Sequence, residues 1–287
     1  MKAIKKIISI TLIIALIGVF YGCKGDDSAD KTTENPTGNA NAATIKSADD
    51  LWGKKIGVQL GTTGDIFASD YEDAEKASKA GDKPVAVIER YNKGADAVLA
   101  LAQGKLDCVI IDNEPAKAFV AAKKGLKILE EEFSVEEYAI AMKKGSELKS
   151  KINTALAELK ADGTIDKIIN NYIGDETKGK TPYTSPEGIE RPNGTLTIGT
   201  EAQFPPYEFI KNQKFVGIDI DLAQAIADKL GMTLKIEDMQ FNGIIDAINS
   251  GKVDVGVAAM TVTEERLLTV DFSDSYTIST QVMIVKE

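Results

Sequence analysis

Three side chains that can hold charged groups stand where apolar runs of this sequence give way to turns. Asp112 follows four apolar residues in "LDCVIID", a position that an ordinary surface charge does not explain. Arg266, in "TVTEER", has a planar guanidinium suited to holding a carboxylate through two parallel hydrogen bonds. Thr63, in "GTTGD" before an expected helix, can offer a hydroxyl and an amide hydrogen to an anion. These residue types favour the recognition of charged groups.

Each of these residues also has an ordinary structural explanation. An isolated arginine such as Arg266 is usually a solvated residue of a short helix. A threonine at the position of Thr63 or Thr263 can serve only as a helix cap. Phe204 and Phe241, taken alone, are more typical of a core than of a ligand contact. For single residues these alternatives stay open.

The elements that must position these residues alternate between strands and amphipathic helices. Apolar runs in the first part of the chain predict strands at 54–60, 83–89, 106–112, 126–131 and 138–143. Helical spacing of apolar residues occurs between and after them, at 95–103, 114–124, 147–159 and 165–172. Alternation of this kind predicts an α/β fold with mainly parallel sheets.

The alternation pauses at 175–194, a stretch rich in proline, glycine and charge that predicts a connecting loop. It then restarts, with expected strands at 195–199, 233–238, 253–260 and 281–287 and expected helices at 218–230 and 242–250. Residues 100–114 and 247–261 share one plan, in which a helix ends, Gly-Lys turns the chain and a buried strand delivers polar groups. Because ligands of open α/β sheets bind beyond the carboxyl ends of strands, this repetition predicts two lobes that face a cleft.

The beginning of the chain predicts export. Three lysines precede an uncharged apolar run that is too short for a comfortable membrane span, and Gly-Cys follows at 22–23. The arrangement resembles the lipobox of bacterial lipoproteins, although two aromatic residues precede Gly22; an ordinary signal peptide with an incidental cysteine is the alternative. Polar residues without periodicity follow at 24–44 and predict a flexible tether. We expect a signal peptide at 1–23 and a lipid on Cys23 that holds the protein to a membrane.

The composition excludes several functions. The chain has 34 basic and 44 acidic residues, a net charge of −10 that becomes −13 without the three lysines of the leader. This balance argues against nucleic acid or anionic lipid as a partner. The sequence has no histidine, the commonest general base and metal ligand, and we expect no catalytic residue, no metal and no cofactor. With Cys23 lipidated, Cys108 has no cysteine left for an intrachain disulfide.

Beyond these patterns, the chain resembles the polar amino-acid-binding proteins of bacterial ABC importers, the extracellular solute-binding protein family 3. The stretches that carry the resemblance are "IGTEAQFPPYEF", "GIDIDLAQAIADKLG", "FNGIIDAINSGKVDVGVAAMTVTEERLLTVDFSD", "GKKIGVQLGTTGD", "GKLDCVIIDNEP" and "ALAELKADGTIDKIINNYIG". Together they cover nearly all of residues 46–287. The resemblance implies an α/β fold of the two-lobed periplasmic-binding-protein type II class, with the ligand cleft between the lobes.

The order of these blocks is rotated. In the usual family member the "IGTEAQFPPYEF" block comes first and the "ADGTIDKIINNYIG" helices come last, whereas here the second part precedes the first. The resemblance therefore implies a circular permutation, which the loop 175–194 permits because domain termini are often close together at the surface. We expect the usual second lobe at 45–137 and the usual first lobe at 138–287. In this division only the crossover at 136–142 still joins the lobes covalently.

The resemblance also implies roles for individual residues. Arg266 matches the arginine that binds the ligand's carboxylate in the family, and Thr63 can present its hydroxyl and amide to the same group. The hydroxyl of Thr261 and the carbonyl of Ala259 lie where the family binds the backbone groups of the ligand. Asp112 matches the acid that pairs with the ligand's ammonium.

The remaining implied contacts concern the side chain of the ligand. Phe204 and Phe241 match the apolar residues that enclose it. Glu201 stands where members that bind cationic side chains often carry an acid, although it can instead serve a neutral amide or face solvent. Three further residues that can tune the choice, and that the sequence does not rank, are Gln203, Tyr207 and Asn113.

The function implied is a monomeric, lipid-anchored receptor that captures a free polar amino acid, of arginine or lysine type, and delivers it to the permease of an ABC importer. Two alternatives belong to other classes: a periplasmic dehydratase-like enzyme on the same architecture, and a module that reports ligand to a signalling partner. The enzyme needs an acid or base beyond Asp112, and the sequence has no nucleophile–base spacing. The sensor needs an output domain, for which we find no pattern.

Overall fold

The computed structural model of the protein describes residues 45–174 and 176–287. The predicted signal peptide at 1–23, with Cys23 and its lipid, and the predicted tether at 24–44 lie outside these residues. Within the described ranges, no helix combines the length and the apolar character that crossing a membrane requires.

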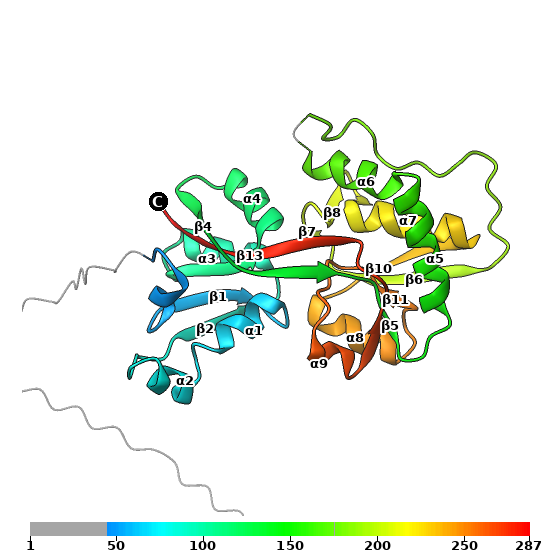
Figure 1. Ribbon diagram of the computed structural model, residues 1–287. Coiled ribbons are helices and arrows are strands. Elements are labelled where there is room, and N and C mark those ends of the chain that lie inside the picture. Colours follow the sequence, from blue (N-terminus) through cyan, green and yellow to red (C-terminus); the bar gives the residue numbers. More distant parts are fainter. Residues whose placement is uncertain (1–44, 175) are drawn as a thin grey trace, which may run out of the picture. The chain divides into compact units, whose positions relative to one another are not determined.

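The first of two five-stranded sheets has the strand order β2-β1-β3-β13-β4 (Figure 1). In that order, its strands are β2 (Val87–Tyr91), β1 (Lys55–Gln59), β3 (Cys108–Asp112), β13 (Thr277–Lys286) and β4 (Leu126–Tyr138). β1 pairs in parallel with β2 and β3, whereas β13 is antiparallel to both β3 and β4. We call this sheet lobe A, together with the helices η1 (Ala48–Leu51), α1 (Thr63–Ser69), α2 (Ala74–Lys79), α3 (Gly94–Ala102) and α4 (Asn113–Ala122).

The second sheet repeats the same plan, with the order β10-β6-β11-β5-β12. Its strands are β10 (Thr233–Asp238), β6 (Thr195–Thr200), β11 (Val255–Gly256), β5 (Ala141–Lys143) and β12 (Val270–Phe272). β6 pairs in parallel with β10 and β11, and β5 is antiparallel to β11 and β12. We call this sheet lobe B, together with the helices α5 (Leu148–Ala161), α6 (Thr164–Ile173), α7 (Ile218–Leu230), η2 (Phe241–Gly243), α8 (Ile244–Asn249) and α9 (Glu264–Leu267).

Each sheet therefore receives its antiparallel strand from a segment that crosses over from the other lobe. β4 of lobe A leads into β5 of lobe B, and β12 of lobe B leads into β13 of lobe A. Figure 1 shows β4 and β13 side by side, as their pairing requires. This corrects our expectation that only the crossover at 136–142 is covalent and that all of 138–287 lies in one lobe. An apolar run predicts a buried strand, but it does not reveal which sheet the strand joins.

A small antiparallel sheet, β7 (Gln203–Phe204), β8 (Glu208–Lys211) and β9 (Lys214–Val216), lies between β6 and α7 in the chain. Its strands have only two to four residues, so their alternation was too short to predict them. The hairpin ends at Gly217, whose φ is 137°, and an added Cβ would lie 2.0 Å from the carbonyl oxygen of Tyr207. Glycine is the residue that tolerates this close approach, and α7 begins immediately after it.

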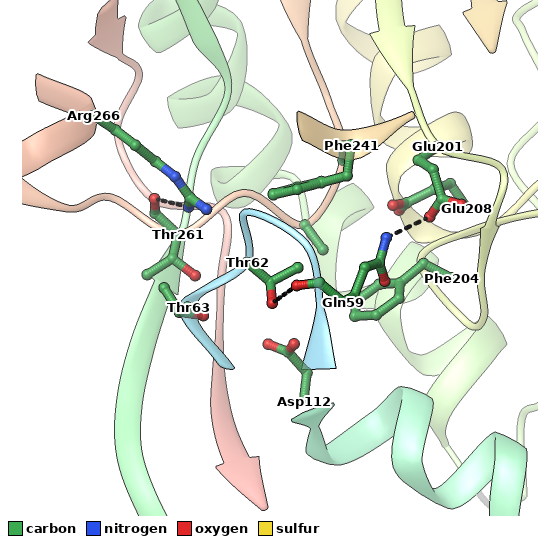
Figure 2. A pocket seen from close by; sticks show the side chains of 12 residues that line it. Gln59, Thr62, Thr63, Asp112, Glu201, Phe204, Glu208, Phe241, Thr261 and Arg266 are labelled. Atoms are coloured by element: carbon green, nitrogen blue, oxygen red, sulfur yellow. Dashed lines mark hydrogen bonds between the residues drawn. The ribbon is translucent and has the colours of Figure 1, made fainter. Parts of the chain in front are cut away.

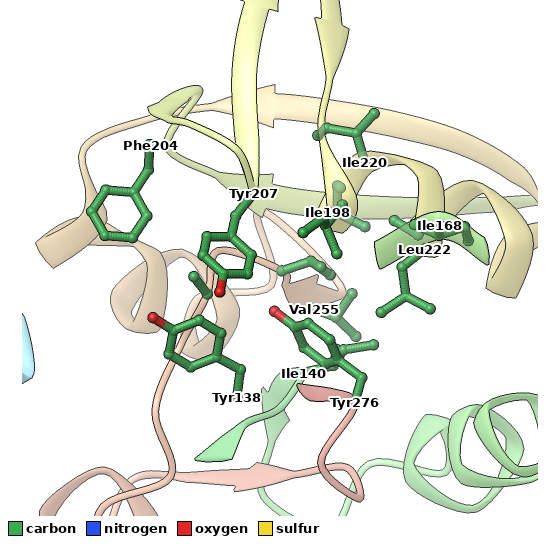
Figure 3. Close-up of a cluster of buried hydrophobic side chains, with 14 of the residues drawn as sticks. Tyr138, Ile140, Ile168, Ile198, Phe204, Tyr207, Ile220, Leu222, Val255 and Tyr276 are labelled. Atoms are coloured by element: carbon green, nitrogen blue, oxygen red, sulfur yellow. The ribbon is translucent and has the colours of Figure 1, made fainter. Parts of the chain in front are cut away.

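Buried apolar side chains of both lobes form one continuous cluster. Three buried tyrosines, Tyr138, Tyr207 and Tyr276, are part of it (Figure 3). The rings of Tyr138 and Tyr207 meet edge to face with their centroids 5.1 Å apart, and those of Tyr138 and Tyr276 lie 6.4 Å apart. Tyrosine combines an apolar ring with a hydroxyl that needs a partner when buried. The tyrosines therefore connect the core to buried carboxylates beside it.

Most elements expected from the sequence are confirmed. Helix α7 and strand β10 have the predicted bounds, and no helix or strand forms in the described part of the loop, 176–194. The strand expected at 253–260 is an exception, because regular pairing is limited to β11. After β11 the backbone turns away through Ala259, whose φ is 46°. This irregular segment lines the pocket described next.

Candidate functional site

A pocket lies between lobe A and lobe B, at the ends of several strands. The cavity between its side chains is small, about 10 Å³ when measured as room for the centre of a water molecule. Figure 2 shows the residues that line it: Gln59, Thr62, Thr63, Asp112, Glu201, Phe204, Glu208, Phe241, Ala258, Ala259, Thr261 and Arg266. All eight residues that the sequence predicted as ligand contacts are among them. Their contact with a ligand stays a prediction.

Arg266 is buried, with 7% of its surface exposed, so it is not the solvated residue that an isolated arginine suggests. Its Nη1 donates to the carbonyl oxygen of Thr261 at 2.7 Å, and its Nη2 donates across to Gly61 of lobe A at 2.9 Å. The guanidinium carbon lies 5.3 Å from the ring centroid of Phe241, which adds a cation–π attraction. Burial lowers the pKa of Arg266 from its ordinary value, and nearby carboxylates oppose that shift. The group therefore supplies a positive charge to the pocket.

Two hydroxyls lie beside Arg266. Thr63 is the first residue of α1, but Thr62 is the residue that caps this helix, because its side chain accepts from the backbone N–H of Asp65. The hydroxyl of Thr63 therefore does not cap this helix, and it donates instead to Glu136 Oε2 at 2.8 Å. Thr261 follows β11, and Figure 2 shows its side chain next to Thr63. Thr263 is a cap, as its alternative explanation stated, since its hydroxyl accepts from the N–H of Arg266 at 3.2 Å.

Asp112 is the last residue of β3 and is 5% exposed. Tyr138 donates its hydroxyl to Asp112. Burial, helped by the negative charge of Glu136, raises the pKa of Asp112 to about 7. A carboxyl group in such an environment gains from a bound cation, which stabilises its ionised form.

Glu201 follows β6 and is 4% exposed, so the alternative that it faces solvent is wrong. Its Oε2 accepts from Gln59 Nε2 of lobe A at 3.2 Å. Its Oε1 has no hydrogen-bond partner among the described residues, and burial raises the pKa of Glu201 to about 7. A buried carboxyl oxygen without a partner costs free energy, so this atom favours a donor on a ligand.

Two further buried acids, Asp219 and Glu208, lie next to the turn at Ala259. The N–H of Ala259 donates to Asp219 Oδ2 at 2.7 Å, and Tyr276 donates its hydroxyl to the same carboxylate at 2.9 Å. Burial, together with the negative charge of Asp219, raises the pKa of Glu208 well above its ordinary value. Glu208 is therefore the member of this pair that more readily holds a proton. The hydrogen bond from Ala259 to Asp219 fixes the turn that carries the carbonyl of Ala259 to the pocket.

The apolar walls come from Phe204, which is buried, and Phe241, which is half-buried. Phe204 also stacks on Tyr207, with ring centroids 6.4 Å apart. Of the three residues that the sequence did not rank, Gln203, Tyr207 and Asn113, none is among the residues that line this pocket.

Four residues that line the pocket were not predicted: Gln59, Thr62, Ala258 and Glu208. Glu136, which accepts from the hydroxyls of Thr63 and Thr261, was not predicted either. The position of Glu208 between two aromatic residues in "PPYEF" could have indicated it. The position of Glu136 at the start of the expected crossover could have indicated that residue. Gln59, at the end of a predicted strand, had the strand-end position that marked Asp112. Within residues 45–174 and 176–287, no group of three His, Cys, Asp or Glu side chains is placed to hold a metal ion.

Two repeated α/β lobes, exchanged strands and a polar pocket between them define the two-lobed α/β fold of the type II class. The predicted fold class is thereby confirmed, whereas the permuted order remains a proposal. Residues 196–287 match the family described as bacterial extracellular solute-binding proteins, family 3.

Individual relatives match parts of the chain. The arginine-binding extracellular protein ArtP of Bacillus subtilis (strain 168) is 38% identical over 104 residues, which cover 36% of this chain and 41% of the relative. A probable histidine-binding protein of Campylobacter jejuni is 39% identical over 85 residues, which cover 30% of this chain and 33% of the relative. A solved ancestral arginine-binding protein bound to arginine is 60% identical over 28% of this chain and 36% of its own, with a TM-score of 0.28. The matches thus span about two fifths or less of the relatives.

Proposed function

We propose that this protein is an extracytoplasmic receptor that binds a cationic amino acid, of arginine or lysine type, and delivers it to an ABC importer. The observation that carries the proposal is the gathering of three buried charged residues, Arg266, Asp112 and Glu201, around one pocket. The family of residues 196–287, and relatives named for binding arginine, support it.

The placement of these charges suits a ligand that is charged at both ends. Arg266, Thr63 and Thr261 stand on one side of the pocket, and Glu201 stands on the opposite side with Phe204 (Figure 2). The carboxylate of an amino acid would face Arg266, its ammonium would face Asp112, and a cationic side chain would reach Glu201. Buried charges are stable only when they are paired, so the unpartnered oxygen of Glu201 favours a cationic over a neutral side chain.

The proposal includes a circular permutation of the usual chain order. Lobe B is assembled from two segments of chain, 139–173 and 195–276, that the loop 176–194 joins. Ile45 and Val285 pack in one small core cluster, so a short link could join the two ends of the described chain. A linear comparison of a permuted chain recovers one block only, as the match at 196–287 does. A chain re-joined in the usual order is expected to keep the ligand profile of the screen below, and a different profile would contradict the permutation.

The proposed function is tested by a ligand screen. The purified protein, freed of bound ligand by unfolding and refolding, is melted with each of the twenty amino acids and ornithine. A ligand at about a hundred times its Kd is expected to stabilise the fold by roughly 2.7 kcal/mol, a shift of several degrees in Tm. We expect this shift with arginine or lysine. Recovery of the ligand unchanged separates binding from turnover, and no shift with any amino acid would overturn the proposal.

Anchoring and delivery are tested together in cells. Loss of this protein is expected to lower the uptake of the amino acid found in the screen, because the importer then lacks its receptor. The full chain should appear in the membrane fraction and should restore uptake. The Cys23→Ala variant should appear in the soluble extracytoplasmic fraction and restore less. Equal fractionation of both proteins would argue against the lipid anchor, and unchanged uptake without the protein would argue against delivery.

A further inference from the structure

Glu136 is a buried carboxylate that the proposed function does not use. It lies two residues before the end of β4 and is 3% exposed. Its Oε2 accepts hydrogen bonds from Thr63 Oγ1 at 2.8 Å, Thr261 Oγ1 at 2.8 Å and Gln281 Nε2 at 3.2 Å. These donors come from both lobes. Its Oε1 accepts from the hydroxyl of Ser134 at 3.3 Å.

Two of these donors are the hydroxyls assigned above to the carboxylate of the ligand. A hydroxyl has one hydrogen, so while Thr63 and Thr261 donate to Glu136 they have none to donate to a ligand. Thr63 also accepts from Gln281 Nε2 at 3.2 Å, which fixes its orientation further. Both hydroxyls are therefore turned toward a carboxylate that belongs to the protein itself.

The negative charges around the two hydroxyls also oppose a ligand carboxylate there. Arg266 contributes one positive charge, and three carboxyl groups, those of Glu136, Asp112 and the exposed Glu265, lie near enough to act on its ionisation. The amino and carboxylate groups of an amino acid sum to zero, whereas an amine alone is positive. A ligand carboxylate held by Arg266 therefore meets Glu136 as a like charge.

We propose that Glu136 competes with the carboxylate of a bound amino acid for the hydroxyls of Thr63 and Thr261, and so determines how strongly the site selects for that carboxylate. The inference rests on the proposed function and adds a specificity-determining residue to it. It explains why a second buried acid stands behind a subsite for an anion. Removing the charge of Glu136 releases the hydroxyls and removes the repulsion, so binding of ligands with a carboxylate is strengthened selectively.

The test compares L-arginine with agmatine, which has the same guanidinium and amine but no carboxylate. Calorimetric Kd values for both ligands are measured with the parent protein and with Glu136→Gln and Glu136→Leu. The ratio of agmatine Kd to arginine Kd is expected to rise about tenfold in Glu136→Gln, the scale of one charge-assisted hydrogen bond, and at least as much in Glu136→Leu. Glu137→Gln is the matched control, because this neighbour on the same strand is exposed, and its ratio should not change.

A ratio that stays within about twofold of the parent value in both variants, or that falls, would overturn the role of Glu136 and leave the proposed function intact. A merely structural role would weaken both ligands equally and leave the ratio unchanged. If the parent protein binds no amino acid at all, the proposed function fails, and this inference fails with it.

Discussion

Arg266→Ala is expected to weaken binding of arginine by about a hundredfold or more, because removing one partner of a buried charge pair costs about 2–5 kcal/mol. The guanidinium is 7% exposed, so water replaces it poorly. The affinity of Arg266→Lys for arginine should lie between those of the parent protein and Arg266→Ala, since lysine keeps the charge but loses the planar fork. The measurement is calorimetric titration below the melting temperature of each variant.

The matched control is Arg191→Ala. Arg191 also forms an ion pair with a buried carboxylate, to Asp228 at 2.6 Å, but it lies outside the pocket. Its removal should lower Tm without changing the Kd of arginine. If Arg266→Ala bound arginine within about threefold of the parent protein, the guanidinium would not be holding the ligand's carboxylate.

The second large effect is expected at Glu201. Glu201→Gln removes the charge that the proposed function pairs with the ligand's cationic side chain, while its amide can keep the contact with Gln59. The affinity for arginine is expected to fall about a hundredfold, since a charged hydrogen bond is lost in a buried site. Affinity for neutral glutamine should fall much less.

The control for this variant is Glu237→Gln. Glu237 pairs with Lys235 on β10 at 2.9 Å and is not among the residues that line the pocket. Titrations with arginine and glutamine give the preference of each protein. A Glu201→Gln variant that still preferred arginine over glutamine by the parent ratio would show that Glu201 does not set the preference.

Two carboxyl groups of the pocket, those of Asp112 and Glu201, make ligand binding depend on pH. The pKa values of Asp112 and Glu201 are raised to about 7, and a cationic ligand binds their ionised forms. For each such group the affinity falls about tenfold between pH 8 and pH 6, so the parent protein should lose up to about a hundredfold. In Glu201→Gln only the part due to Asp112 should remain. An affinity that is flat across this range would contradict the pairing.

Stability without ligand should move in the opposite direction. An acid whose pKa is higher in the folded than in the unfolded state binds more protons when folded, so its destabilising contribution is present above pH 7 and fades toward pH 4. The free energy of unfolding is therefore expected to increase as the pH falls through this window. Opposite trends in affinity and stability distinguish buried ligand-binding acids from a general loss of structure at low pH.

Much of the fold was predictable because its periodic patterns are local. Helix α7 combines regular apolar spacing with glycine at both ends, and its bounds were predicted as observed. β3 is a short strand of four apolar residues followed by Asp112; the apolar run marks a central strand, and the acid at its end marked the pocket. The small sheet β7-β8-β9 was missed because its strands are too short to show a period.

The residues of the candidate site likewise divide into those that local sequence patterns predicted and those that they did not. Asp112 and Glu201 were predicted because each is an acid at the end of an expected strand and matches an acid of the family that the chain resembles. Glu136 was not found, although it lies beside the hydroxyls that were. Its neighbour Glu137 has the same residue type in the same strand and is exposed, and only the pleat of β4 separates the two.

The sequence by itself determined the α/β class and the order of the helices and strands, because these depend on local periodicity. Eight of the residues that line the pocket were also predicted from it, through the family resemblance together with the positions of strand ends. Only the tertiary structure decided where β13 pairs, because an apolar strand can join either sheet. It likewise decided that Thr63 and Thr261, nearly two hundred residues apart in the chain, donate to one oxygen of Glu136. Contacts across the two lobes arise from the crossing of β4 and β13, and no local pattern in the chain encodes them.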